Sequence, residues 1–117
     1  MNNFFESLDE RQSKCIRELN DQFRTSLVGG AVLFTAGIVG LGAKIEAEIL
    51  EAIRAFDAFD HNNDPFGEHD FGRLDVVGHS VIFKIDYFDV YRARHSPDPT
   101  DADVTERVMT IMLAGEW

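Results

Sequence analysis

The sequence has a single cysteine and few basic residues, and each shortage excludes a class of protein. Cys15 cannot form an internal disulfide, so the fold must depend on its hydrophobic core. Eleven lysines and arginines stand against 21 aspartates and glutamates, which gives a net charge of −10. Such a charge repels the phosphates of nucleic acids and the anionic surface of membranes. We therefore expect neither direct nucleic-acid binding nor membrane association.

We also expect no secretory leader and no membrane-spanning helix. Residues 1–10 carry three acidic side chains where a secretory leader would be basic and then apolar. The longest uncharged stretch, residues 25–43, contains five glycines, which favours a buried strand and a glycine-rich turn over a bilayer helix. We expect one cytoplasmic domain over residues 1–117, since this length suits a single core. Its first helical segment, about residues 7–24, could be an appended element.

Three segments have the period of amphipathic helices. The first covers about residues 8–23 and opens with a capping box, Ser7–Glu10. The second covers about residues 42–56, with its isoleucines on one face. The third is expected to begin near residues 101–103. Its inward-facing residues would be Val104, Val108, Ile111 and Met112.

Alternating apolar residues predict strands at about residues 31–35, 70–77 and 80–89. A short turn at Val77–His79 joins the last two into a β-hairpin. The predicted fold is α+β, with three helices packed on a small, mainly antiparallel sheet of about three strands.

The segment 57–72 concentrates side chains that bind or catalyse. It holds five carboxylates and two histidines without a basic residue. Loops carry binding residues more often than the elements they connect. The neighbouring strand adds two more carboxylates. The candidate binding residues are therefore Asp57, Asp60, Asp64, Glu68, His69, Asp70, Asp86 and Asp89.

One interpretation of this segment is calcium binding. Asp60-x-Asn62-x-Asp64 begins like an EF-hand loop, which needs oxygen ligands at alternate positions. The match then fails, because Pro65 and Phe71 stand where the loop needs glycine and a bidentate glutamate.

Two further interpretations remain. His69 and Asp70 could form a metal or acid–base site, although neither an HExxH nor a CxxC spacing supports it. Alternatively the segment is structural: its Asp and Asn side chains hold turns, and His69 pairs with Asp70. Gly67 and Gly72 would then supply unusual backbone angles. The structural reading is the default, and the sequence predicts no catalytic residue, metal or other cofactor.

Four segments together carry a family resemblance. They are residues 62–72, 83–89, 96–101 and 105–114, and they include the motifs NDPxGEHDFG and KIDYxD. With them the chain resembles a family of small bacterial proteins known as a domain of unknown function, over about Gly30 to Trp117. The resemblance implies no reaction. It implies a setting, because similar genes are often carried by plasmids and other mobile elements.

The setting and the charge lead to a functional expectation. Residues 45–91 hold eleven acidic and three basic side chains, so most of the excess charge lies there. We expect a non-enzymatic inhibitor, of the anti-restriction or anti-CRISPR kind, that occupies a basic nucleic-acid-binding surface of a nuclease or CRISPR effector. One alternative is a metal-dependent hydrolase using the loop of His69 and Asp70. Another is a structural or regulatory subunit of a host complex, in which residues 8–23 would be an oligomerisation helix; a homodimer is also possible on this reading.

Overall fold

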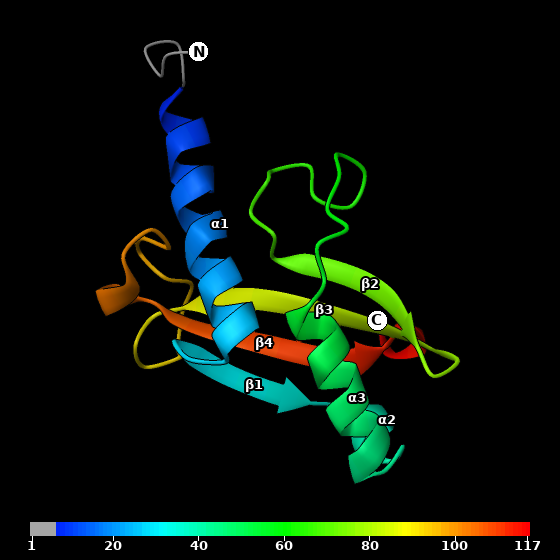
Figure 1. Ribbon diagram of the computed structural model, residues 1–117. Helices are drawn as coiled ribbons and strands as arrows, with labels where there is room; N and C mark the ends of the chain where they lie inside the picture. Colours follow the sequence, from blue (N-terminus) through cyan, green and yellow to red (C-terminus); the bar gives the residue numbers. More distant parts are fainter. Residues whose placement is uncertain (1–6) are drawn as a thin grey trace.

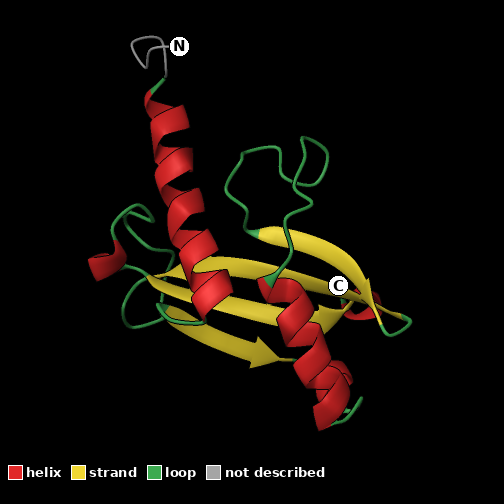
Figure 2. Cartoon of the chain, viewed as in Figure 1, coloured by secondary structure: helices red, strands yellow, loops and turns green. Residues whose placement is uncertain are grey.

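The computed structural model describes residues 7–117, which form a four-stranded sheet with helices packed against one face (Figure 1, Figure 2). The α+β prediction is thus confirmed. In chain order the elements are α1 (Leu8–Ser26), β1 (Gly30–Phe34), α2 (Ala36–Val39), α3 (Ala43–Arg54), β2 (Phe71–Val76), β3 (His79–Phe88), the 3₁₀ turn η2 (Ala102–Val104), β4 (Glu106–Leu113) and the 3₁₀ turn η3 (Ala114–Glu116).

The first helix begins where its cap predicts. The Ser7 side chain accepts a hydrogen bond from the Glu10 N–H at 3.0 Å, which satisfies one of the free donors of the first turn. The helix is capped by Leu27, whose N–H donates to the Phe23 carbonyl and whose φ of 62° turns the chain out of the helix. None of the helices within residues 7–117 has the length and apolar character needed to cross a bilayer.

The strands lie in the order β1-β4-β3-β2. β1 pairs with β4 in parallel, and the other two pairings are antiparallel. The predicted hairpin is confirmed: Val77 and Gly78, both with positive φ, form the two-residue turn between β2 and β3.

The main core lies between the sheet and the helices. α1 contributes Phe23, and α3 contributes Ile49 and Ile53. The sheet supplies alternate residues of its two central strands, among them Phe83 of β3 and Met109 of β4. α1 therefore shares one core with the sheet.

The expected third helix is wrong, because residues 106–113 form the strand β4. β4 lies between β1 and β3, so both of its edges are paired, and the side chains on both of its faces are largely buried. Met109 and Ile111 enter the main core, while Val108 and Met112 are 5% exposed on the opposite side. A central strand has an almost continuous apolar run. Such a run also contains apolar residues at helical spacing. This spacing is the reason that the sequence predicted a helix here.

Gly72 has a different role from the one expected. Its backbone is not among those with positive φ. Instead, the Phe83 ring packs directly against it, and a Cβ there would also lie 2.8 Å from the Phe56 ring. The glycine is required by close packing of β2 against the aromatic core.

Candidate functional site

The acidic segment forms an ordered loop that connects α3 to β2 and lies beside α1 (Figure 1). Asp60 Oδ1 accepts hydrogen bonds from the N–H groups of Asn62 and Asn63. The Asn63 side chain in turn donates to the Ala58 carbonyl at 2.8 Å. The first half of the loop is thus held by Asx turns, as the structural reading predicted.

Asp64 holds the second half of the loop from the inside. It is 9% exposed, and its carboxylate accepts the N–H groups of Glu68 and His69. Gly67 has a φ of +69°, which confirms one of the two predicted glycine angles. From α1, Arg17 Nη1 donates to the Gly67 carbonyl at 2.9 Å.

His69 does not pair with Asp70, so that part of the prediction is wrong. Its Nδ1 lies 2.9 Å from Asp21 Oδ1 on α1, and its Nε2 lies 3.6 Å from Asp64 Oδ2. Its ring stacks on Phe59 with the centroids 3.9 Å apart. His69 therefore connects the loop to α1, and a φ of 56° turns its side chain in that direction.

A buried polar cluster, which the sequence analysis missed, lies beneath the loop. Asn20 of α1 is fully buried and donates from Nδ2 to the Glu68 carbonyl and to the Tyr87 hydroxyl. Its Oδ1 accepts from Arg107 Nε at 2.8 Å, and Tyr87 donates to Glu68 Oε1 at 2.8 Å. The cluster joins α1, the loop, β3 and β4. Its one signal in the sequence is a polar residue on the apolar face of the first helix.

Burial sets the ionisation of this cluster. It raises the pKa of the Tyr87 phenol above its usual range, and it lowers the pKa of Arg107. Tyr87 is thus a neutral donor at neutral pH. The Arg107 guanidinium lies over the Tyr87 ring, 5.1 Å from its centroid, and this contact favours the cation.

A second buried arginine ends α3. Arg24 Nη1 donates to the carbonyls of Ile53, Arg54 and Phe56, at and just beyond the C-terminal end of the helix. Its Nη2 forms an ion pair with Asp21 at 3.0 Å. Arg24 thus fixes the point where the acidic loop begins.

Asp70 lies at the other end of the loop and is electrostatically unusual. Burial raises its pKa to about 6, and the nearby charges of Glu68, Asp64 and Asp86 act in the same direction. Asp70 and Asp86 both line a hollow of about 310 Å³. Asp86 also forms an ion pair with Lys84, at 2.7 Å.

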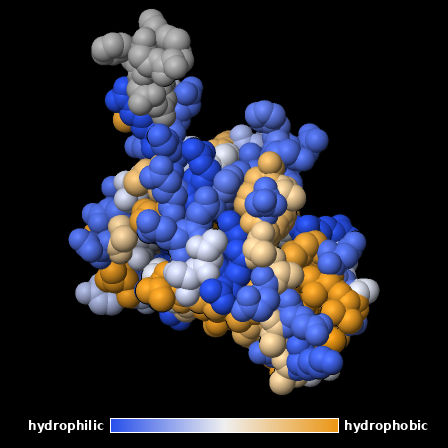
Figure 3. Space-filling view, in the orientation of Figure 1, coloured by the Kyte–Doolittle hydropathy of each residue, from blue (hydrophilic) through white to orange (hydrophobic). Residues whose placement is uncertain are grey.

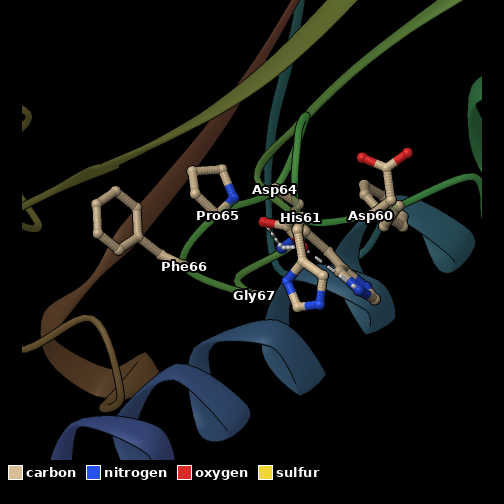
Figure 4. Close-up of a pocket in the computed structure, with 8 residues that line it drawn as sticks. Asp60, His61, Asp64, Pro65, Phe66 and Gly67 are labelled. Carbon is tan, nitrogen blue, oxygen red and sulfur yellow. Dashed lines mark hydrogen bonds and ion pairs between the residues drawn. The ribbon is translucent and has the colours of Figure 1, made fainter.

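Two larger hollows flank the tip of the loop. One has a volume of about 530 Å³ and includes Phe59, Asp60, His61 and Asp64 in its lining. Figure 4 shows its labelled side chains, with Phe66 and Asp60 at opposite ends and His61 between them. The other hollow, of about 430 Å³, lies between the loop and the first turns of α1.

The eight predicted binding residues divide into three groups. Asp64, Glu68 and His69 belong to the contacts that hold the loop, and Asp60 holds its turn. Asp70 and Asp86 meet in one hollow. Asp57 is exposed where the loop begins, and Asp89 accepts the N–H groups of Tyr91 and Ala93 beyond β3. Within residues 7–117, no three His, Cys, Asp or Glu side chains are placed to share a metal ion.

Comparison with known proteins gives one match. A family model described as "Protein of unknown function (DUF3768)" matches residues 34–116. The match covers more than two thirds of the chain and includes all four segments that carry the resemblance. No curated protein and no solved structure matches.

Proposed function

The chain belongs to the DUF3768 family, whose function is unknown, and from this premise we propose that it is a small acidic protein that occupies a basic, nucleic-acid-binding surface on another protein. In this proposal it acts without chemistry of its own, by excluding DNA or RNA from a nuclease or CRISPR effector. The mobile-element setting is part of the proposal.

The distribution of charge between interior and surface supports this proposal most. Two of the eleven basic residues, Arg24 and Arg107, are buried and bond mainly to backbone carbonyls and Asn20. Of the carboxylates in residues 7–117, only Asp64 is buried. The surface is therefore more acidic than the composition alone implies. Hydrophilic residues cover much of the α1 side of the molecule (Figure 3).

Three basic side chains outside the core are held in ion pairs, each of which also neutralises one carboxylate and so leaves the net charge unchanged. Arg54 pairs with Glu51, Lys84 with Asp86, and Arg92 with Glu106. An acidic surface of this kind is steered towards a basic groove, and the attraction weakens as salt screens it.

The test measures DNA cleavage by a panel of purified restriction endonucleases and CRISPR effector complexes in the presence of the protein. We expect at least one enzyme to be inhibited through a stable complex. Its affinity should fall by about tenfold or more between about 50 and 300 mM NaCl. If no enzyme is inhibited, or if the affinity does not depend on salt, the proposal is wrong.

Two matched triple variants locate the surface. The loop variant combines Asp57→Asn, Asp60→Asn and Asp70→Asn, and the amide at position 60 can still hold its Asx turn. The control variant removes the same charge elsewhere, through Glu48→Gln, Asp75→Asn and Asp103→Asn, all exposed. We expect the loop variant alone to lose affinity substantially, and an equal loss from both would contradict a binding surface on the loop.

A hydrolase is the second candidate. The observation that favours it is Asp70, a carboxyl whose pKa of about 6 suits proton transfer near neutrality and which faces an open hollow with Asp86. Metal analysis of the purified protein, followed by hydrolysis assays with and without added Mn²⁺ or Zn²⁺, tests this candidate. Activity abolished by Asp70→Asn would favour it over the binding protein.

A further inference from the structure

We propose that Phe66 is the anchor of this acidic surface, and that it takes the place of a nucleic-acid base in the partner's site. The inference rests on the proposed function and makes it more specific. The partner is a protein with a single-strand-binding groove, in which apolar or aromatic side chains stack bases and Lys or Arg side chains hold phosphates.

Phe66 is the exception among the phenylalanines of residues 7–117. Its exposed fraction is 77%, whereas every other one of them is buried or partly buried. Phe59, in the same loop, stacks on Phe56 and on His69. The loop thus has enough aromatic neighbours to bury a ring, yet Phe66 remains in water. Large aromatic side chains held out in this way are common anchors of protein interfaces.

The backbone that carries Phe66 is fixed before any partner binds. Residues 64–67 form a tight turn in which the Gly67 N–H donates to the Asp64 carbonyl at 3.1 Å. Pro65 precedes Phe66, and the proline ring restricts the φ of Pro65. Arg17 of α1 holds the Gly67 carbonyl, and the Asp64 carboxylate holds the N–H groups that follow. A ring presented on a preorganised turn loses less entropy on binding than one on a mobile loop.

Phe66 forms a ridge between the two larger hollows, since its side chain lines both. One hollow includes Asp60 and Asp64, and the other includes Asp9 and Glu10 from the first turn of α1. Lys14 and Arg17 also line the second hollow and balance its two carboxylates, so the acidic excess around the ring lies in the first hollow, where Asp60 is exposed. A partner that stacks on the ring could therefore place a Lys or Arg side chain in the first hollow, beside Asp60.

This arrangement corresponds to one nucleotide of an unpaired strand. In a single-strand-binding groove a base lies flat on an aromatic or apolar surface while neighbouring phosphates contact basic groups. A duplex keeps its bases inside the stack and offers no isolated ring. The exposed ring between carboxylates therefore fits a groove for single strands better than a surface for duplexes.

The experiment uses an enzyme that the wild-type chain inhibits in the panel described above. We expect Phe66→Ala to raise the concentration for half-maximal inhibition by about tenfold or more, because one stacking contact is lost. Phe66→Trp should stay within about threefold of wild type, because the indole also stacks. Tyr91→Ala is the matched control, since it removes another exposed aromatic ring and should change nothing.

Competition identifies the site. A short oligothymidine should relieve inhibition, and a duplex of equal length and strand concentration should not. Circular dichroism and urea unfolding must show that Phe66→Ala folds like wild type, as expected for a side chain in solvent.

The failures of the two proposals can be told apart. If the wild type inhibits but Phe66→Ala inhibits equally well, or if the duplex competes as strongly as the single strand, this inference is overturned and the proposed function stands. If the wild type inhibits no enzyme, both are overturned.

Discussion

Carboxylates only six residues apart in the acidic loop are used in opposite ways. Asp64 is 9% exposed and accepts two backbone N–H groups, so its charge is compensated by directed donors. Asp70 is partly buried beside other carboxylates, and burial with those charges raises its pKa to about 6. Asp64 therefore fixes the loop, whereas Asp70 is a carboxyl whose ionisation weakens the folded state.

We predict that Asp70→Asn stabilises the protein at pH 7. The pKa of Asp70 is about 6 in the folded state against 3.8 ordinarily, so the folded protein retains a proton that the unfolded chain releases. The stability from this proton is fully present below about pH 4 and is lost as the pH rises to about 6. At pH 7 the variant should gain about 1 kcal/mol or less, because solvent partly screens this group. Urea unfolding between pH 4 and pH 8 measures the gain.

The control for this prediction is Asp75→Asn, which removes the same charge from an exposed position on β2, the strand that follows Asp70. It should leave the pH profile close to that of wild type. A carboxyl titration of Asp70 followed by NMR gives an independent reading. A midpoint near 4, or equal effects of the two variants, would contradict the prediction.

At the scale of elements, β2 and α3 approach each other across the Phe83 and Phe56 rings, and Gly72 makes this approach feasible. We predict that Gly72→Ala lowers the free energy of unfolding by about 1–3 kcal/mol, because the added methyl group overpacks a rigid aromatic core. The measurement is the urea midpoint at constant slope.

Gly115→Ala provides the matched comparison. A Cβ at position 115 meets nothing within 4 Å, so its effect should stay within about 0.5 kcal/mol. Equal effects of the two substitutions would show that the packing at Gly72 tolerates a methyl group.

The elements differ in how far the sequence predicts them, for physical reasons. α1 and the β2–β3 hairpin follow from local signals, a Ser7 cap and a two-residue turn at Val77 and Gly78. β4 does not, because a strand covered on both faces loses the alternation that identifies strands. Its place between β1 and β3 depends on contacts with residues far away in the sequence.

In the candidate site, too, local contacts could be predicted from the sequence and long-range contacts could not. The turns held by Asp60 could be predicted, because an Asx turn needs only neighbouring residues. The pairing of His69 with Asp21 could not, since it joins residues 48 positions apart. Nor could the buried bond between Asn20 and Arg107, 87 positions apart. A polar residue at a buried helical position indicates that a partner exists without identifying it.

At the scale of the whole molecule, the family match covers less of the chain than the folded domain does. The match begins at residue 34, at the end of β1, and leaves α1 outside. Yet α1 supplies the Phe23 ring of the core, the Asn20 amide of the buried cluster and the Arg24 guanidinium that ends α3. The sheet and the acidic loop thus both depend on a helix outside the matched region.

We predict that deleting residues 1–26 abolishes cooperative folding. Loss of the Phe23 side chain alone should cost about 3–5 kcal/mol, and Arg107 and the α3 carbonyls would lose their buried partners as well. The combined loss is comparable with the whole stability of a small domain, about 5–15 kcal/mol. Circular dichroism during urea titration should show no transition. A synthetic peptide of residues 7–27 should restore one, because it returns these contacts, and a cooperative transition without the peptide would mean that α1 is an appended element after all.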